Sequence, residues 1–534
     1  MRRSFAPALV LVLAVASAAG ARLLGGTAAP AAPAGASGPS PAFRGPLLFG
    51  LGTRESEQAG TAPAAAAALL AAPAERRKAL ACSKGHDVVN ADYRDRIGAA
   101  CEVVSLRVSR DTVSETEAQH ETEVEPDSFA FGSTIVTSFQ IGRLAGGGAL
   151  AIGFATSRDA GRTWRSGVLP RLSSYSKPAG PYALVSDPSV AYDTVHRVWL
   201  IASLAAPDRG SVLTVSRSRD GVAWSAPVLA TASDFGDYDK EWVSCDNWAH
   251  SPFRGRCYLA YVNFTAGSME TRHSDDGGKT WSSPSFGLAS LPAAANVNGT
   301  QPISQPDGTL LVLYTAFNSF LVGPNEIGVV RSSDGGLTFG RPDHVADLMS
   351  LDLEGVRAPP FVSVAHDANG IVYAAWSDCR FQDGCSTDGI VYSRSRNGVA
   401  WSVPARVATG DTRRDVDHFV PGLDVIGSGK TTRLAVAYYA RPQPIGCGYT
   451  CSTNVGVWLS LSNNAGANWL RPQRLNAETM RGSWLADSER GKFLGDYIST
   501  SFVRGRPMPV FALAQRPSGG RLHQAIYVTT RLAR

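Results

Sequence analysis

Four arginines stand beside short apolar segments of the 534-residue sequence, and their side chains are suited to binding an anion. Arg143 and Arg441 follow such segments, Arg357 comes just before a pair of prolines, and Arg380 lies between two closely spaced cysteines. A guanidinium group can hold a carboxylate or a sulfate through two parallel donors, so several of them at one cavity would bind an acidic ligand. The alternative is that each arginine pairs with a neighbouring aspartate at the rim.

A second set of polar residues has the groups that acid–base chemistry requires. Hydrolysis of a glycosidic bond needs one carboxyl group as proton donor and a second group as base or nucleophile, which different parts of the chain could supply. The alternative is that carboxylates at strand starts accept hydrogen bonds from nearby amides, and that the histidine is simply hydrogen-bonded. The candidate catalytic residues are Glu125, Asp239, Asp378, His418, Asp496 and Tyr497.

A repeated eight-residue segment determines how the chain could bring these residues together. The segment SDDGGKTW, which starts at Ser274, has five relatives, and the first serines of the six copies are 56 to 67 residues apart. Regular recurrence at this period is typical of propellers and other repeat folds. The relatives are SRDAGRTW from Ser157, SRDGVAW from Ser218, SSDGGLTF from Ser332, SRNGVAW from Ser395 and SNNAGANW from Ser462.

Each copy reads as a hairpin turn that stabilises itself. Glycine supplies the positive φ of a tight turn, and the short acidic side chain accepts hydrogen bonds from the amides of the turn. Two copies have asparagine, which keeps the acceptor oxygen without the charge, and this favours a structural role over a catalytic one. The structural residues of the six turns are Asp159, Asp220, Asp276, Asp334, Asn397 and Asn464.

The segments between the turns predict an all-β fold of four-stranded blades. Each repeat has a short entry segment and three further apolar segments separated by turn residues, as in a propeller blade. The entries number seven, and the segment 101–109 would supply the missing fourth strand of the last blade, so we expect seven blades; six is the alternative. The entries are Glu125-Pro126, Asp187-Pro188, Asp239-Lys240, Gln301-Pro302, Pro359-Pro360, Val420-Pro421 and Gly495-Asp496.

From about Glu123 to the C-terminus, the repeated turns on a predicted propeller resemble the Asp boxes of the sialidase superfamily. The segments DKEWVSCDNW and GDYIST also resemble a bacterial group of exported sialidase-like proteins. The resemblance implies an arginine triad for a substrate carboxylate, an aspartate acid, and a tyrosine nucleophile paired with a glutamate. Asp239 would then be the acid, and Tyr497 with Glu125 would form the pair. The early Phe-Arg-Ile-Pro motif of the family is absent from the start of the first repeat.

The N-terminal part predicts an exported protein. Residues 1–21 have the charged start, apolar run and small residues of a signal peptide, and 22–81 form a leader rich in Ala, Pro and Gly. The segment 82–534 is then a single propeller domain. An even number of cysteines in an exported chain indicates disulfides, and closely spaced cysteines pair. The expected disulfides join Cys82 with Cys101, Cys245 with Cys257, Cys379 with Cys385, and Cys447 with Cys451.

Charge and composition narrow the expected partners. Through residue 81 the chain has eight basic and three acidic side chains, and the remainder has 43 of each, so the folded part is neutral. A neutral surface disfavours a nucleic-acid partner. We expect a secreted protein, extracellular or periplasmic, with no membrane span, no cofactor and no metal, and we expect it to be a monomer. Its predicted function is an exo-glycosidase of sialidase-like type acting on acidic glycans. The alternative is a non-catalytic propeller that binds a glycan or a protein.

Overall fold

The computed structural model describes residues 103–207, 209–231, 236–288, 295–318, 325–410, 415–443 and 453–532. This part of the chain consists almost entirely of antiparallel β-sheet and contains no α-helix, so the expectation of an all-β protein is confirmed. It has three short 3-10 helices: Asp383–Cys385, Gly429–Thr431 and Gly482–Trp484. The predicted signal peptide and leader lie outside the described residues.

The first sheet has two four-stranded halves, β2–β5 and β6–β9, linked by the pairing of Ala149 with Val185. Each half follows the chain back and forth, as expected for strands joined by short turns. Its strands are β2 (Glu123–Phe131), β3 (Thr134–Arg143), β4 (Ala149–Ser157), β5 (Arg165–Val168), β6 (Leu184–Asp193), β7 (Val198–Ala206), β8 (Val212–Ser218) and β9 (Val228–Leu229).

Four further sheets repeat the same four-stranded order. They are β10 (Tyr238–Cys245), β11 (Cys257–Asn263), β12 (Ser268–Ser274) and β13 (Ser285–Leu288); β14 (Ala295–Ser304), β15 (Leu310–Asn318), β16 (Glu326–Ser332) and β17 (Asp343–Asp347); β18 (Ser363–His366), β19 (Val372–Asp378), β20 (Gly389–Ser395) and β21 (Ala405–Arg406); and β22 (Val416–Ile426), β23 (Arg433–Pro442), β24 (Gly456–Ser462) and β25 (Gln473–Arg474).

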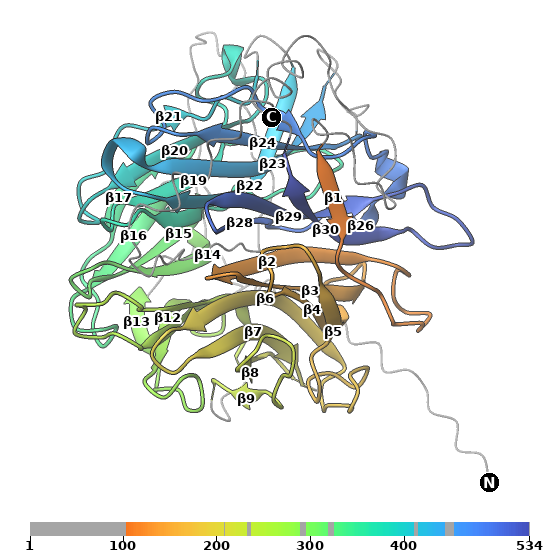
Figure 1. The fold of residues 1–534 in the computed structure, drawn as a ribbon, viewed down its shortest axis with the longest axis horizontal. Helices are drawn as coiled ribbons and strands as arrows, with labels where there is room; N and C mark the ends of the chain where they lie inside the picture. Colours follow the sequence, from red (N-terminus) through yellow and green to blue (C-terminus); the bar gives the residue numbers. More distant parts are fainter. Residues whose placement is uncertain are drawn as a thin grey trace, which may run out of the picture. The chain divides into compact units, whose positions relative to one another are not determined.

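The last sheet combines the two ends of the described chain. Its order is β28 (Ser499–Val503), β29 (Arg506–Ala514), β30 (Gln524–Arg531) and then β1 (Val104–Arg107), which pairs with β30. The orange β1 therefore lies beside the blue β30 in Figure 1. This pairing involves the segment that was expected to supply the fourth strand. A separate hairpin, β26 (Ala486–Ser488) with β27 (Gly491–Phe493), precedes β28.

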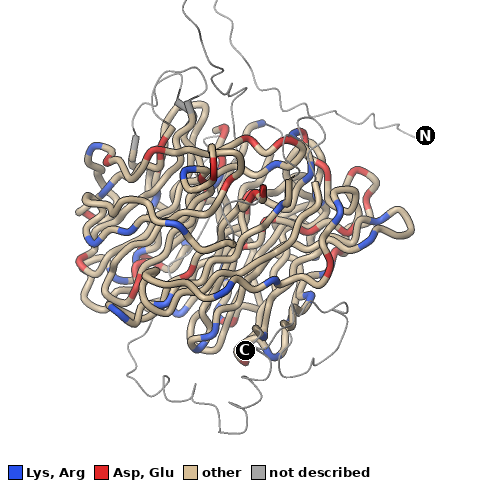
Figure 2. Tube along the Cα trace, turned by 90° about the horizontal axis from the view of Figure 1, so that it is seen from above, with Lys and Arg blue, Asp and Glu red and all other residues tan. Residues whose placement is uncertain are grey.

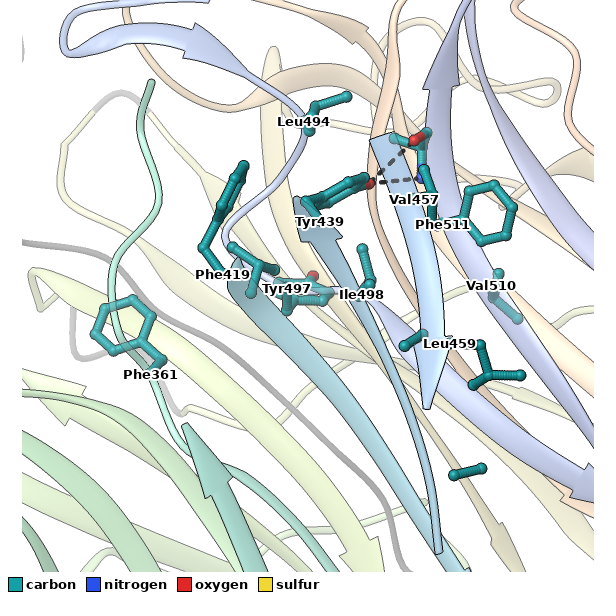
Figure 3. Packing of buried hydrophobic residues seen from close by; sticks show 14 of the residues in the cluster. Phe361, Phe419, Tyr439, Val457, Leu459, Leu494, Tyr497, Ile498, Val510 and Phe511 are labelled. Atoms are coloured by element: carbon teal, nitrogen blue, oxygen red, sulfur yellow. Dashed lines mark hydrogen bonds between the residues drawn. The ribbon is translucent and has the colours of Figure 1, made fainter. Parts of the chain in front are cut away.

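The first strands of the sheets contact one another in chain order. Contacts run from β2 to β6, β10, β14, β18, β22 and β28, and β28 contacts β2 again. Side chains distant in the sequence therefore meet where these strands pass each other. Figure 3 shows one part of the packing, in which Phe419, Tyr439 and Tyr497 lie among buried aliphatic side chains. The Tyr439 hydroxyl donates to the Ala512 carbonyl at 3.0 Å, so this buried polar group is satisfied.

The six repeated turns share one hydrogen-bond pattern. In the turn after β12, Asp276 Oδ1 accepts from the amides of Lys279 and Thr280 at 2.8 and 3.0 Å, and Oδ2 accepts from the Thr280 hydroxyl at 2.8 Å. The Ser274 hydroxyl donates to Asp276 at 2.9 Å and accepts from the Gly278 amide at 2.9 Å. The equivalent oxygens of Asn397 and Asn464 also accept amide hydrogens. The side chain thus replaces hydrogen bonds that a tight turn cannot make within its own backbone.

Two of the four expected disulfides are present: Cys245–Cys257, which joins β10 to β11, and Cys379–Cys385, which closes a loop after β19. The pairs Cys82–Cys101 and Cys447–Cys451 fall outside the described residues.

In the described ranges, no helix is long and apolar enough to span a membrane.

The hydrogen bonds to Asp276 should contribute measurably to stability. We expect Asp276→Ala to lower the free energy of unfolding by about 1 kcal/mol, as for loss of a helix cap, because several turn amides lose their acceptor. Burial acts to raise the pKa of Asp276, but the Thr280 and Ser274 hydrogen bonds outweigh it and lower the pKa to about 2. A carboxylate with a lowered folded-state pKa stabilises above its unfolded pKa of about 3.9, and this stabilisation is lost as the pH falls to about 2.

Urea unfolding of the wild type, Asp276→Ala and Asn464→Ala at pH 7 and pH 3 measures both effects. Asn464→Ala is the matched control, because it removes an acceptor that carries no charge and should cost the same stability at both pH values. A loss of stability at Asp276→Ala that is equal at both pH values would contradict the role of the carboxylate charge.

Candidate functional site

Backbone strain is concentrated at equivalent places of the first strands. The strands β2, β6, β10, β14 and β22 each contain an irregular step in the pairing register. At this step Glu125, Asp187 and Lys240 have φ of 54°, 51° and 50°, a region that non-glycine residues rarely adopt. Such strain persists only where the surrounding structure imposes it, and it is frequent at functional sites. The side chains of these three residues meet.

The Lys240 ammonium group lies between three carboxylates. Its Nζ is 3.2 Å from Glu125 Oε1, 3.2 Å from Asp187 Oδ1 and 3.3 Å from Asp496 Oδ2. The Lys240 side chain is 2% exposed, and the Asp496 side chain is fully buried. Because water cannot solvate these charges, they depend on one another. These ion pairs join β2, β6 and β10 to the segment that leads into β28.

Two of the predicted arginines border this group of charges. Arg357 donates from Nε to Asp496 Oδ1 at 2.9 Å and forms a second bond from its NH2 group to Oδ2. The guanidinium carbons of Arg143 and Arg357 lie 4.6 and 4.8 Å from the centroid of the Phe493 ring. A ring face favours cations, so Phe493 holds the two like charges near each other. We call the seven residues Glu125, Arg143, Asp187, Asp239, Lys240, Arg357 and Asp496 the central cluster.

Gln140 on β3 orients two of the carboxyl groups. Its Nε2 atom hydrogen-bonds to Glu125 Oε2 and donates to the Ser186 hydroxyl at 2.9 Å and to Asp187 Oδ1 at 3.4 Å. Ser186 in turn donates to Asp187 Oδ1 at 2.7 Å. The Asp496 amide donates to Glu125 Oε1 at 3.2 Å. These contacts hold Glu125 and Asp187 side by side.

The environment moves the pKa values of these two carboxyl groups apart. Burial raises the pKa of Glu125, and the negative charges of Asp187 and Asp496 add to this effect, against the Lys240 charge. Burial acts on Asp187 in the same direction, but Lys240 and the Ser186 hydroxyl outweigh it and lower its pKa. One carboxyl group is therefore held protonated beside an ionised one, the division of roles that acid–base catalysis uses.

Asp239 is a second protonated carboxyl group of the central cluster. Burial, followed by the negative charge of Asp187, raises the pKa of Asp239 well above its usual range. Asn298 Nδ2 donates to Asp239 Oδ2 at 2.9 Å, which leaves Oδ1 for the proton. The cluster reaches solvent mainly through Arg357, whose side chain is 11% exposed, and Asp187, at 6%.

The structure places Tyr497 in the hydrophobic core. Its hydroxyl donates to the Pro188 carbonyl at 2.8 Å, and its ring lies 5.2 Å from Lys240 Nζ and edge-on to Trp242. Burial, and then the charge of Glu125, raises the pKa of Tyr497 well above its usual range. A buried hydroxyl with a higher pKa is a weaker nucleophile. In this arrangement Tyr497 supports the Lys240 ammonium group with its ring.

Three other predicted site residues, Asp378, Arg380 and Arg441, take part in two separate ion pairs. Arg380 binds both oxygens of Asp378 at 2.7 Å. Arg441 binds Asp417 Oδ2 from Nε and NH2 at 3.2 and 2.9 Å, and also donates to a backbone carbonyl. These contacts match the alternative in which each arginine pairs with a nearby aspartate. Buried His418 contacts a backbone carbonyl at 3.3 Å, and burial lowers its pKa to about 4, so it is neutral at pH 7.

Sequence reasoning missed three residues of this site: Gln140, Lys240 and Phe493. Lys240 stands inside a recognised entry segment, and several carboxylates expected at one place require a cation between them. That requirement was the signal available for Lys240. Gln140 lies within a strand and Phe493 in a short hairpin, and neither has a sequence pattern that marks it.

Within the described ranges, no group of three or more His, Cys, Asp or Glu residues is arranged to hold a metal ion. At the central cluster, the Lys240 ammonium group supplies the positive charge between the carboxylates. Figure 2 shows that acidic and basic residues are interspersed over the described part of the chain instead of forming one large patch of either sign.

The central cluster can provide proton donors, an ionised carboxylate and guanidinium groups for an anion.

Comparison with known proteins gives structural similarity alone. No protein-family model matches the sequence, and no curated protein matches it. A Dyadobacter fermentans protein of unknown function aligns at 17% identity over 63% of this chain and 95% of its own, with a TM-score of 0.41. A Hadza microbial sialidase aligns at 17% identity over 63% of this chain and 66% of its own, with a TM-score of 0.41. A family PL25 ulvan lyase aligns at 12% identity over 78% and 96%, with a TM-score of 0.44.

Removal of the Lys240 charge should destabilise the fold strongly. Lys240→Met leaves buried Glu125 and Asp187 without the cation that they contact, and Asp496 with Arg357 alone, so we expect the free energy of unfolding to fall by about 3–5 kcal/mol. Lys240 lowers the pKa values of Glu125 and Asp187, so without this cation both pKa values rise in the folded state. Acids with raised folded-state pKa values lose stability as the pH increases, so the deficit should grow between pH 5 and pH 8.

Urea unfolding at these two pH values provides the measurement, with Lys279→Met as control because Lys279 is exposed in a repeated turn. The control should stay within about 0.5 kcal/mol of the wild type. A Lys240→Met protein as stable as the control would show that the buried charges do not need their cation.

Proposed function

We propose that the described sheets form a seven-bladed propeller and that the protein is an exported glycan-active enzyme, an exo-glycosidase acting on acidic glycans. The cyclic contacts of the seven first strands, with β28 against β2, support the blade count. Export through a signal peptide at residues 1–21 is part of the proposal, and the two disulfides are compatible with it. We expect a monomer.

The observation that carries the proposed activity is the opposite protonation of neighbouring carboxyl groups in the central cluster. Asp239 is held protonated and is the proton donor to the glycosidic oxygen. Asp187 is held ionised and is the base for the attacking water, or stabilises positive charge at the anomeric carbon. Glu125 keeps its proton and fixes Asp187 through the shared Gln140 and Lys240 contacts.

Arg357 is the proposed anchor for an acidic substituent of the substrate. Among the cations of the central cluster for which an ion pair is described, Arg357 has the most exposed side chain. Its guanidinium group already binds the Asp496 carboxylate through two donors. Arg143 also lies against the Phe493 ring, and burial with the nearby Arg357 charge lowers the pKa of Arg143 to about 10, so it remains charged at neutral pH. A substrate carboxylate or sulfate would relieve the repulsion between these two cations.

The second candidate function is a binding propeller that holds an acidic glycan without cleaving it. The hydrogen bond from the buried Tyr497 hydroxyl to the Pro188 carbonyl supports this candidate, because the tyrosine nucleophile implied by the sialidase resemblance would need a free hydroxyl. The enzyme proposed here uses carboxyl groups alone. The two candidates therefore differ in whether Asp239 transfers a proton.

The test is release of sugar by the full-length protein from a panel of aryl glycosides and acidic oligosaccharides. We expect Asp239→Asn to lower kcat by at least about 100-fold, because an amide cannot donate the proton. The matched control Asp275→Asn should retain wild-type rates, since Asp275 is a surface residue, 58% exposed and paired with Arg256. Saturable glycan binding with no turnover of any substrate would reject the enzyme and support the binding propeller.

The rate should also depend on pH in one direction. Because the raised pKa keeps Asp239 protonated in the neutral range, kcat should fall as the pH rises through that pKa. Profiles of kcat between pH 4 and pH 10 measure this fall. An activity that increases steadily with pH would contradict the role of Asp239 as the acid.

A further inference from the structure

A cavity of about 410 Å³ lies apart from the residues of the central cluster. It forms where the segment between β1 and β2 meets the segment between β29 and β30. The Leu522 amide donates to the His120 carbonyl at 3.1 Å, and the Gln524 amide donates to the Glu121 carbonyl at 2.8 Å. The residues that line the cavity are Arg107, Ser109, Arg110, Asp111, Glu121 and Arg521.

The acidic groups of the cavity are already used by the protein. Asp111 Oδ1 accepts from the Val113 amide at 2.8 Å, and its Oδ2 accepts from the Thr122 amide at 3.3 Å. Glu121 accepts from Arg521 NH1 at 3.1 Å and is paired with His523. Asp111 therefore holds the first segment together, Glu121 joins the two segments, and Arg521 is largely neutralised by Glu121.

Two guanidinium groups, those of Arg107 and Arg110, form no described ion pair or hydrogen bond with a carboxylate that lines the cavity. Arg107 donates from Nε to the Ser109 carbonyl at 3.1 Å, and its side chain is 40% exposed. The one ion pair described for Arg107 is with buried Glu123, at 3.8 Å, and burial raises the pKa of Glu123 to about 8, so this group is mostly uncharged at neutral pH. Arg110 is exposed and, among the described residues, has no hydrogen bond or ion pair.

A volume of this size is at the small end of known ligand sites, and it accommodates a sugar unit. Arginine binds carboxylate and sulfate groups through paired donors, and neutral sugars do not require them. The cavity is also close to the central cluster, because Glu121 and Glu125 are four residues apart on one strand and its entry, a span of at most about 14 Å. This Cα–Cα span is within the length of a short chain of sugars.

We propose that this cavity is a second anion subsite, in which Arg107 and Arg110 bind the carboxylate or sulfate of another sugar unit of the same acidic glycan. The inference rests on the proposed function and adds to it that the substrate carries more than one acidic group. A glycan with one charged end would occupy the central cluster alone, whereas a polymer with repeated acidic groups would occupy both sites.

The test is affinity electrophoresis of the full-length protein at fixed ionic strength in gels that contain polygalacturonate, dextran sulfate or neutral dextran. The variants are Arg110→Ala, Arg107→Ala and Arg162→Ala. Arg162 is the matched control, because it is exposed in a repeated turn and removes the same charge away from the cavity. Arg110→Ala is the main variant, since no described contact of the fold depends on its side chain.

We expect Arg110→Ala and Arg107→Ala to weaken binding of at least one acidic polymer about three- to tenfold, the loss of one charge-assisted contact, and Arg162→Ala to leave it unchanged. Retardation by neutral dextran should be unaffected. Equal losses in all three variants would show a general charge effect and overturn the subsite. The subsite would also be overturned if neither acidic polymer retarded the wild type. It would equally be overturned if the cavity variants were retarded as strongly as the wild type.

A second readout separates this inference from the proposed function. For a short aryl glycoside that reaches only the central cluster, Arg110→Ala should keep the wild-type kcat/KM, while for a longer acidic oligosaccharide KM should rise about three- to tenfold. Unchanged KM for both substrates would overturn the subsite and leave the enzyme proposal standing. Absence of turnover for every substrate would reject the enzyme, and the gel measurements would still decide on the subsite.

Discussion

The ion pairs of Lys240 are the interaction on which the rest of the site depends. Its ammonium group contacts carboxylates of Glu125, Asp187 and Asp496, which come from parts of the chain up to 371 residues apart. Removing these charged groups from water is costly, and the mutual attraction offsets this cost only when every group keeps its partners. The positive-φ conformations of Glu125, Asp187 and Lys240 add further strain. Buried ion pairs of this kind are weak evidence for a gain in stability, and here they hold the carboxyl groups of the central cluster in place.

Local features of the fold were predictable, because the interactions that define them lie within a few residues. The turn around Asp276 is held by hydrogen bonds to Ser274 and Thr280, so the pattern of the turn contains all its partners. Strand segments follow from apolar residues between such turns. The pairing of 104–107 with β30 was also accessible, because a repeat with three strands leaves an edge to be filled.

The site was predictable only in part, for a physical reason. Arg143, Arg357 and Asp496 were expected at one place, and they do meet near Phe493. Arg380 and Arg441 were expected there as well, but each is bound by an aspartate of its own sheet. Whether a guanidinium faces a cavity or a neighbour depends on side-chain direction, which the sequence does not encode locally. Lys240 was missed because its partners are distant in the chain.

The most direct measurement of this account is a double-mutant cycle between Lys240→Met and Asp496→Asn, with free energies of unfolding from urea denaturation. If the buried ion pairs hold the central cluster together, the two substitutions should be coupled, with an interaction free energy of at least about 1 kcal/mol. Effects that add to within about 0.5 kcal/mol would show that Lys240 and Asp496 act independently, and would contradict the account.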